Sequence, residues 1–349
     1  MSKRWQQIVK KKSKYLVTAL AAALVGIPLV TKRSWSSRIT RFFIPKYTTK
    51  PILEDPRLFA VLKRFLLAKG SIPFRTPRSR YIHYSLDIFK GNLELTIYPG
   101  LKLKRQGELS RADTAENEKT IGESVTATRN PAAPLLYIHG GGYVEQPTEY
   151  HYRFLWRLAT ALKRPVKLFV YPEVPDEVAV DVISKTSEWL EAQERSIVLG
   201  DSSGGGLIMS VMQVTQYEPL ALVLISPWLD VSMTNPDIVL NESHDATLSR
   251  AGLLEIAKLY AGDLDLSDPL VSPINYPFKK LPKMAIYIGT NDMFLADVRK
   301  FAHLIKTVTP ALHYVEAPYM EHVYPILPTI EGEAAVRDII RYTKEIFYT

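Results

Sequence analysis

Residues 196–214, SIVLGDSSGGGLIMSVMQV, decide the fold because they join a short apolar run to a glycine-rich turn and then to a second apolar run. The residues that follow Ser196 are apolar and mostly β-branched, as is typical of a buried strand. The residues from Leu207 onward contain no helix breaker and keep a long apolar face, which predicts a helix packed on a sheet. The sequence therefore predicts a strand, a tight turn and a helix in immediate succession.

The turn offers two serines and two interpretations. GDSSGG is similar to the run around the nucleophile of trypsin-like proteases, but it also contains G-x-S-x-G, a nucleophile elbow. In the elbow, Gly200 and Gly204 flank Ser202 at two residues' distance, where small residues let strand and helix approach closely. Ser203 fits less well, because Asp201 would then stand where a glycine is needed. A glycine-rich turn with solvated serines is the remaining alternative.

The rest of the chain favours the elbow. A trypsin-like protease needs a glycine directly after the serine and a double β-barrel, whereas this chain has no cysteine and alternates strands with helices. This alternation implies an α/β protein with a mostly parallel, doubly wound sheet. The predicted strands are 92–99, 134–139, 166–171, 196–200, 220–226, 283–289 and 311–317, and the predicted helices are 149–163, 176–193, 294–308 and 333–347. Polar residues 103–133 predict a flexible loop, and residues 232–280 predict a helical cap insertion over the sheet edge.

Positive charge is concentrated at the N-terminus. Residues 1–50 hold twelve of the 44 Lys and Arg residues and no acidic residue, so 32 basic and all 36 acidic residues remain in the body. The body therefore has no basic excess, and the composition gives no reason to expect a nucleic-acid partner.

A segment of 17 uncharged residues, 15–31, lies between Lys14 and Lys32. As a helix it spans about 25 Å, close to the ~27 Å core of an endoplasmic-reticulum bilayer. A cleaved signal peptide and a soluble helix are the alternatives, but no small-x-small cleavage site precedes Lys32. The sequence thus predicts a single transmembrane anchor at 15–31.

The charge bias across this anchor predicts its orientation. More basic residues precede the span than closely follow it, which favours a cytosolic tail at 1–14 and a lumenal body. We expect a single-pass type II protein of the endoplasmic-reticulum membrane, with juxtamembrane and cap helices at 32–91 and a catalytic domain at 92–349. The sequon at Asn241 is a possible glycosylation site.

The chemistry of a serine hydrolase requires donors for an oxyanion. His139 is followed by Gly140, Gly141 and Gly142 directly after a predicted strand. Successive glycines let backbone N–H groups converge, so we expect Gly140 and Gly141 to bind the oxyanion together with the N–H of Ser203. We interpret His139 as a residue that shapes this loop.

The base and the orienting acid are expected after the nucleophile in the order acid, then histidine. Asp292 stands just beyond a predicted strand, at the carboxyl edge where ligands bind. Asp297 is the second candidate, one turn into the next helix. His322 lies in a loop after the last strand, whereas His303 and His313 lie within a helix and a strand and are interpreted as structural.

Together, HGGGYV, GDSSGG, GTNDMFLAD, EHV and SPWLDVS resemble the hormone-sensitive-lipase-like branch of the α/β hydrolases over residues 134–349. The resemblance implies the α/β-hydrolase fold, a serine carboxylic-ester hydrolase, and no cofactor or metal. Three features depart from the family pattern. Ser203 replaces an alanine, Phe294 replaces a leucine, and YPEVPDEV lacks the fuller Y-R-L-A-P-E run.

The basic tail, single span and hydrolase domain together resemble the fungal steryl acetyl hydrolases. That resemblance implies an enzyme of the endoplasmic-reticulum membrane that removes acetate from sterols, with an apolar ester as substrate and the bilayer as partner. A general lipase or carboxylesterase, a peptidase or amidase, and a non-catalytic ligand-binding protein on the same fold are the alternatives. The oligomeric state is left open.

Overall fold

The computed structural model describes residues 75–79, 81–100 and 133–348, together with residues 34, 36, 37, 40 and 57. The predicted tail at 1–14, the span at 15–31 and nearly all of the loop at 103–133 lie outside these residues. Within the described part of the chain, no helix is both long enough and apolar enough to cross a membrane.

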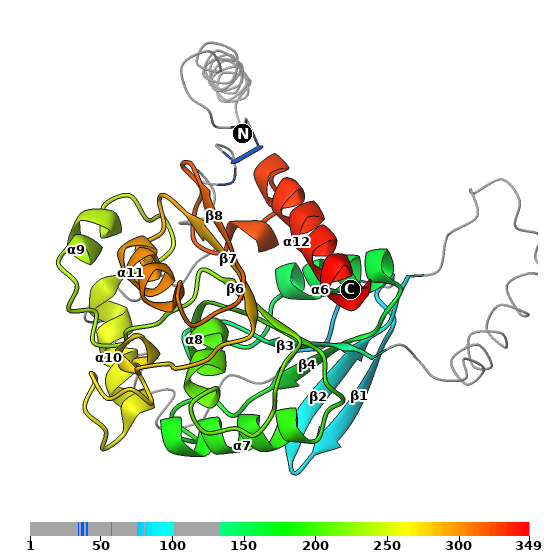
Figure 1. Cartoon of the computed structure of the whole chain (residues 1–349), viewed down its shortest axis with the longest axis horizontal. Helices are drawn as coiled ribbons and strands as arrows, with labels where there is room; N and C mark the ends of the chain where they lie inside the picture. Colours follow the sequence, from blue (N-terminus) through cyan, green and yellow to red (C-terminus); the bar gives the residue numbers. More distant parts are fainter. Residues whose placement is uncertain are drawn as a thin grey trace, which may run out of the picture.

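The protein is built around one eight-stranded sheet, seen at the centre of Figure 1. The strands lie in the order β1-β2-β4-β3-β5-β6-β7-β8. β1, β2 and β4 pair antiparallel, and every other neighbouring pair is parallel, so the sheet is mostly parallel as predicted. The strands are β1 (Tyr84–Phe89), β2 (Asn92–Ile97), β3 (Leu135–Ile138), β4 (Val166–Val170), β5 (Ile197–Asp201), β6 (Ala221–Ile225), β7 (Lys283–Gly289) and β8 (Leu312–Ala317).

Helices cover both faces of this sheet, as expected for a doubly wound fold (Figure 1). Side chains of alternate residues enter opposite cores: Leu222 and Leu224 belong to one, Val223 and Ile225 to the other. This alternation follows from the two-residue period of a strand. On one face lie α6 (Glu149–Leu162) and α12 (Ile330–Tyr348), and on the other lie α7 (Ala179–Glu191), α8 (Ser202–Val211) and α11 (Leu295–Ile305).

The sheet begins earlier than the sequence predicted. Residues 32–91 were expected to form juxtamembrane and cap helices, but Tyr84–Phe89 form the edge strand β1. A two-residue turn at Lys90 and Gly91, both with positive φ, joins it to β2. The expected boundary at residue 92 therefore falls inside a hairpin. None of the six side chains of β1 is fully buried, and although Tyr84, Leu86 and Ile88 alternate with Ser85 and Asp87 as in a strand, all three apolar side chains are exposed at the sheet edge.

The elbow helix also begins earlier, at Ser202 rather than near Leu207. Its first turns contain three glycines, which normally disfavour a helix. Here close packing requires them: a Cβ on Gly204 would lie 2.2 Å from the carbonyl oxygen of Ile138 and 2.4 Å from that of His139. The glycines thus allow α8 to lie directly on β3 and on the loop that follows it.

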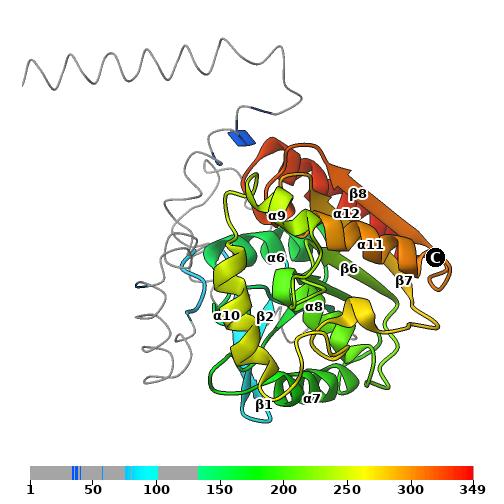
Figure 2. The same cartoon turned by 90° about the vertical axis from the view of Figure 1, so that its left-hand side faces the viewer.

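The insertion expected at 232–280 contains α9 (Asp237–Glu242), α10 (Arg250–Ala261) and a short 3-10 helix at Pro273–Asn275, between β6 and β7. Figure 2 shows α10 running in front of the domain. The Tyr260 ring of α10 stacks on the Tyr143 ring at 3.6 Å between centroids. The insertion therefore packs against the segment that follows residues 139–142, which we call the glycine loop. Asn241 lies on α9, partly exposed, and its glycosylation stays a prediction.

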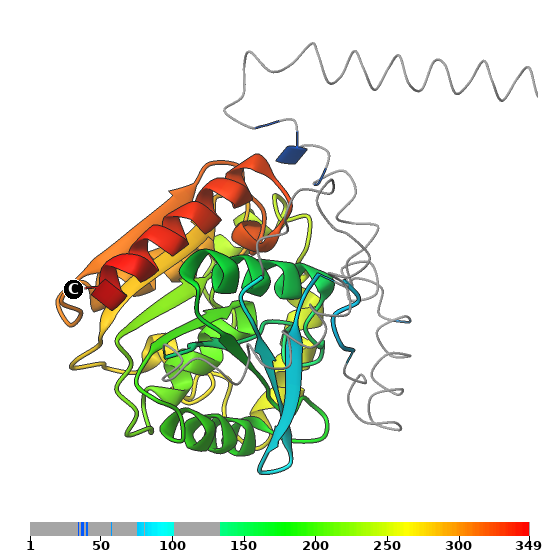
Figure 3. The same cartoon turned by 90° about the vertical axis from the view of Figure 1, so that its right-hand side faces the viewer.

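Ser34 and Ser36 make hydrogen bonds to the first turn of α12, the long helix drawn in red in Figure 3. The Ser34 N–H and hydroxyl donate to the two carboxylate oxygens of Glu331, at 2.7 and 2.6 Å. The Ile330 N–H donates to the Ser36 hydroxyl at 2.9 Å. We call this set of contacts the Ser34–Glu331 clasp. It ties the N-terminal segment to the start of the last helix.

Candidate active site

Ser202 lies where β5 ends and α8 begins. Its φ is +50°, in the left-handed region that a side chain with a Cβ rarely adopts. The backbone is held there by Trp228, whose backbone N–H donates to the Ser202 carbonyl oxygen at 2.9 Å. Strained turns of this kind are typical of functional sites, where surrounding structure keeps one side chain in a fixed direction. The predicted elbow is therefore present.

The structure brings Ser202, His322 and Asp292 together at the carboxyl edge of the sheet. The Ser202 Oγ lies 2.9 Å from the His322 Nε2, and the His322 Nδ1 lies 2.9 Å from the Asp292 Oδ2. All three side chains are at least nine-tenths buried. An imidazole with one nitrogen on a carboxylate and the other on a hydroxyl can accept the hydroxyl proton.

The charge balance around His322 suits a proton acceptor. Burial alone would lower the pKa of His322, but the carboxylates of Asp292, Asp245 and Asp201 outweigh it, so the pKa is raised above the ordinary value. The imidazolium formed when Ser202 loses its proton is therefore stabilised where it forms.

Two neighbouring contacts fix the acid and the base. Asp292 follows β7, and its Oδ1 accepts the Phe294 N–H at 2.9 Å. The N–H of Val323, directly after His322, donates to the Ser226 Oγ at 3.0 Å. The Phe294 ring also meets the His322 ring edge-on, with centroids 5.3 Å apart. The segment after β7 therefore holds the imidazole itself, and the segment after β6 holds the backbone next to it.

The structure keeps the other predicted candidates out of this cluster. Asp297 lies on α11 and accepts from the Asn235 amide at 2.8 Å. His303 is exposed on α11, and His313 contacts Asp338 at 2.6 Å on the α12 side of the sheet. His139 is buried, and its Nδ1 lies 2.7 Å from the Gly140 carbonyl oxygen, as expected for a residue that shapes the loop.

One predicted oxyanion donor is wrong. The Gly140 N–H donates to the Asp201 Oδ1 at 2.8 Å, so it is directed at a carboxylate and cannot serve an oxyanion in this arrangement. Gly141 has φ +125°, and a Cβ there would lie 2.1 Å from the Glu145 carbonyl oxygen, so only glycine fits. Among the described residues the Gly141 N–H makes no backbone hydrogen bond, and Ser203 lies in the first turn of α8, where N–H groups have no intrahelical acceptor, so both stay candidate donors. Gly142 follows in the same loop with φ +59°.

Sequence reasoning missed a second buried carboxylate, Asp245, between α9 and α10. Its Oδ2 accepts the Met293 N–H at 2.8 Å, and its Oδ1 accepts the Thr247 N–H at 2.7 Å. Burial and the nearby Asp292 raise the pKa of Asp245 to about 6. No motif marks this residue, because only the fold brings the insertion against the segment that carries Asp292.

Replacing Asp245 with asparagine is expected to move the acidic limb of the kcat/KM pH profile to lower pH. The Asp245 carboxylate helps raise the pKa of His322, and the neutral amide removes that contribution, so the free base persists at lower pH. Rate profiles from pH 5 to 9 measure the shift, with Asp265→Asn on the exposed surface as control. A limb that stays in place or moves to higher pH contradicts the assignment.

A third buried carboxyl, Glu173, follows β4 in the segment that departs from the family pattern. It is 1% exposed, and within the described residues neither oxygen makes a hydrogen bond of normal geometry, although Gln146 lies close by. Burial raises the pKa of Glu173 to about 8. The group is thus largely protonated in the folded protein at neutral pH.

Glu173→Gln is expected to stabilise the protein more at pH 8.5 than at pH 5. The folded state keeps a proton that the unfolded chain releases near pH 4.5, so the free energy of unfolding falls as pH rises from about 4.5 to 8. Each pKa unit corresponds to about 1.4 kcal/mol. Thermal unfolding at both pH values measures the effect, with exposed Glu194→Gln as control. An equal change in Tm at both pH values would refute the prediction.

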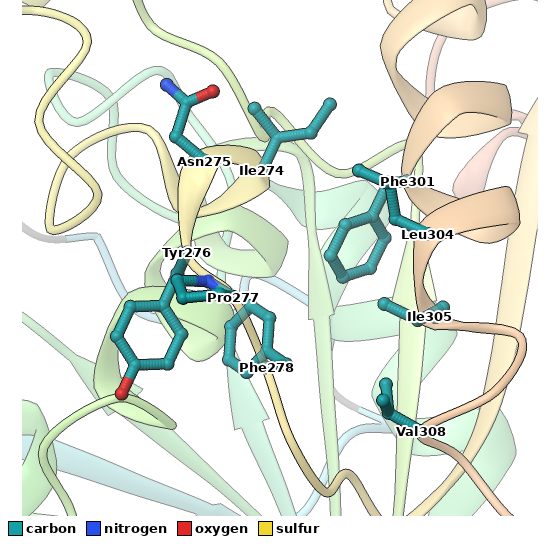
Figure 4. A pocket seen from close by; sticks show the side chains of 9 residues that line it. All are labelled: Ile274, Asn275, Tyr276, Pro277, Phe278, Phe301, Leu304, Ile305 and Val308. Carbon is teal, nitrogen blue, oxygen red and sulfur yellow. The ribbon is translucent and has the colours of Figure 1, made fainter.

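A separate apolar pocket lies between α11 and the 273–278 segment, and Figure 4 shows its walls. Its lining residues do not include Ser202, His322 or Asp292, which we call the Ser202 cluster, so this pocket is not the candidate active site. The lining residues are Ile274, Asn275, Tyr276, Pro277, Phe278, Phe301, Leu304, Ile305 and Val308.

Comparison with known proteins agrees with this fold. Residues 135–326 match the family of the alpha/beta hydrolase fold, and the chain belongs to this family. An acetyl-hydrolase from Streptomyces hygroscopicus is 30% identical over 230 residues, which cover 61% of this chain and 76% of the relative. An esterase from Acinetobacter venetianus is 27% identical over 205 residues, which cover 55% of this chain and 68% of the relative.

Solved structures share the fold. The crystal structure of EstE7, a hormone-sensitive-lipase homologue from a metagenome library, matches with a TM-score of 0.66 at 20% identity, covering 89% of this chain and 98% of that one. Taken together, the family match, the esterase and acetyl-hydrolase relatives and this shared fold confirm the prediction of a hormone-sensitive-lipase-like α/β hydrolase. The finer resemblance to steryl acetyl hydrolases stays a prediction.

Proposed function

We propose that the protein is a serine carboxylic-ester hydrolase, with Ser202 as nucleophile, His322 as general base and acid, and Asp292 as the residue that orients the imidazole. The observation that carries the proposal is the pair of 2.9 Å contacts that join Ser202 to His322 and His322 to Asp292. The esterase and acetyl-hydrolase among the relatives support the same reaction class.

In the proposed reaction, His322 takes the Ser202 proton while the Oγ attacks the ester carbonyl carbon. The oxyanion of the tetrahedral intermediate accepts hydrogen bonds from the Gly141 and Ser203 N–H groups, and each such donor is worth about 3–4 kcal/mol. The C–O bond then breaks, and His322 returns its proton to the departing alcohol. Water, deprotonated by His322, releases the acid and restores the serine.

The proposed substrates are short-acyl esters of apolar alcohols, such as steryl acetates. The support is the resemblance of the tail, span and domain to steryl acetyl hydrolases, together with the acetyl-hydrolase from Streptomyces hygroscopicus. Each methylene added to an acyl group is worth only about 0.8 kcal/mol in an apolar pocket. Selection by acyl length is therefore expected to be graded unless the acyl pocket is closed sterically.

We further propose that residues 15–31 anchor the protein in the endoplasmic-reticulum membrane with the catalytic domain in the lumen. Only Lys32 and Arg33 separate this segment from Ser34, which the clasp ties to the start of α12. α12 begins eight residues after His322, and a Cβ on Gly332 in its first turn would lie 2.6 Å from the carbonyl oxygen of Tyr324, so the start of α12 packs against the segment that carries His322. An anchor joined at that point would keep the candidate active site near the bilayer, where apolar esters partition.

The test of the substrate class compares specific activity on cholesteryl acetate, cholesteryl oleate and trioleoylglycerol in the same micelles. The acetate is expected to be hydrolysed fastest. Higher activity on either oleate ester would contradict the short-acyl proposal and favour a general lipase. Alkaline carbonate extraction tests the anchor separately, since the full chain should remain with the membranes.

A non-catalytic ligand-binding protein on the same fold is the second candidate. Turnover of p-nitrophenyl acetate by the detergent-solubilised protein separates the two. Catalytic turnover supports the hydrolase, and binding without turnover supports the second candidate.

A further inference from the structure

A buried polar network around Asp201 lies next to Ser202, His322 and Asp292, and within the described residues it makes no side-chain hydrogen bond to these three. The Asp201 Oδ1 accepts from the Tyr137 hydroxyl at 2.6 Å and from the Gly140 N–H at 2.8 Å. The Asp201 Oδ2 lies 3.2 Å from the His151 Nε2. Asp201 is 2% exposed and directly precedes the nucleophile. Its carboxylate thus joins β3, the glycine loop and α6 to the nucleophile turn.

The hydrogen bonds around His151 define which ring nitrogen carries the proton. The Thr148 N–H donates to the His151 Nδ1 at 3.0 Å, so this nitrogen accepts through its lone pair. In this arrangement the proton is on Nε2, which donates to Asp201. The ring spans from the backbone at the start of α6 to the residue before the nucleophile.

The Asp201 carboxylate is charged in this network. Burial alone would raise the pKa of Asp201, but His151, Tyr137 and the Gly140 N–H lower it below its usual value. A buried carboxylate that accepts three hydrogen bonds is rigid, because each lost bond leaves part of the charge uncompensated. Its hold on the Gly140 N–H therefore sets how far the glycine loop stands from Ser202.

We propose that Asp201 and His151 are positioning residues that hold the glycine loop in register with the nucleophile, so that the Gly141 N–H is directed at the oxyanion. The inference rests on the proposed ester hydrolysis. Neither residue touches the substrate. His151 holds the Asp201 carboxylate through a hydrogen bond, and Asp201 in turn holds the Gly140 N–H. Because Gly141 is the next residue, the position of Gly140 sets the direction of the Gly141 N–H.

This role predicts a specific kinetic signature. A loop that is out of position weakens binding of the oxyanion, which exists only in the transition state, and leaves binding of the ground-state ester nearly unchanged. Misplacement of a catalytic group by about 1 Å can lower the rate by about 10²-fold. Loss of the His151 bond should therefore lower kcat by about 10- to 100-fold and change KM by less than about threefold.

The experiment compares His151→Ala, His151→Leu and His151→Gln with wild type, using p-nitrophenyl acetate and a trifluoromethyl ketone inhibitor. The ketone forms a hemiketal oxyanion on the serine, so its Ki should rise by the same factor as kcat falls. Glutamine can donate from about the place of Nε2 and should restore much of the rate. Leucine keeps the side-chain volume and serves if the alanine variant does not fold.

His313→Gln is the matched control, since His313 also contacts an aspartate, Asp338, but on the far face of the sheet. It should leave kcat and the inhibitor Ki within about twofold of wild type. Folded alanine or leucine variants with unchanged kcat and Ki would overturn the inference, as would equal changes in kcat and KM. An inactive wild-type protein would instead contradict the proposed function.

Discussion

Replacement of Ser202 by alanine is expected to lower kcat for a short-acyl p-nitrophenyl ester by about 10⁴- to 10⁶-fold. Its Oγ lies 2.9 Å from the His322 Nε2, and no other hydroxyl in the described structure makes that contact. Without it, the remaining groups can only bind the ester and its oxyanion. Initial rates of the purified variant and wild type, at saturating substrate, give the factor.

Ser203→Ala is the matched control for this prediction. Ser203 is fully buried, and its hydroxyl lies 3.4 Å from the Tyr171 hydroxyl rather than near His322. Its proposed contribution is its backbone N–H, which alanine retains, so kcat should stay within about threefold of wild type. Loss of activity in Ser203→Ala together with full activity in Ser202→Ala would overturn the assignment of the nucleophile.

Asp292→Asn is expected to lower kcat by about 10⁴-fold with little change in the fold. In the present site Oδ1 accepts the Phe294 N–H and Oδ2 faces the His322 Nδ1. An asparagine that keeps its oxygen on Phe294 presents its NH₂ group to Nδ1. The imidazole then adopts the other tautomer, with the proton on Nε2, and cannot take the proton of Ser202.

The control for Asp292 is Asp297→Asn. Asp297 lies one turn into α11 and is bonded to Asn235, away from the imidazole, so its replacement should change kcat by no more than a few-fold. Rates measured from pH 6 to 9 reveal whether extra base restores Asp292→Asn. A modest loss for Asp292→Asn alongside a large loss for Asp297→Asn would contradict the site described above.

Apolar runs with clear boundaries made most of the sheet predictable. The strand expected at 283–289 is β7 with the same bounds, because every residue after Lys283 is buried and the run ends at a glycine. β1 carried a weaker signal, because Tyr84, Leu86 and Ile88 alternate with Ser85 and Asp87, but only over six residues and with the apolar side chains exposed. The start of α8 at Ser202 could not be predicted, because glycines normally disfavour a helix. Here they are needed because the neighbouring backbone leaves no room for a Cβ.

For the site, the sequence motifs identified the side chains better than the direction of the backbone groups. Ser202, Asp292 and His322 meet as their order in the chain suggested. The motif also identified the glycine loop, but it did not predict that the Gly140 N–H is directed at Asp201. That direction depends on a carboxylate from a different strand, and therefore on the folded arrangement.

The residues that support the site, His151 and Asp245, had still weaker signals in the sequence. His151 stands three residues after Thr148 and reads as an ordinary part of a helix start, yet it contacts Asp201 at 3.2 Å. Asp245 lies in an insertion with no catalytic motif and meets the Asp292 loop only in three dimensions. Such contacts join elements far apart in the chain, and local periodicity carries no information about them.

The central claim, that Ser202 is the nucleophile of an ester hydrolase, is tested most directly by locating a covalent adduct. The wild-type protein is treated with a fluorophosphonate, digested, and mapped by tandem mass spectrometry. The account predicts one phosphonylated residue, Ser202, with no adduct in Ser202→Ala and a normal adduct in Ser203→Ala. An adduct on Ser203, or a folded wild-type protein that neither reacts nor hydrolyses esters, would contradict it.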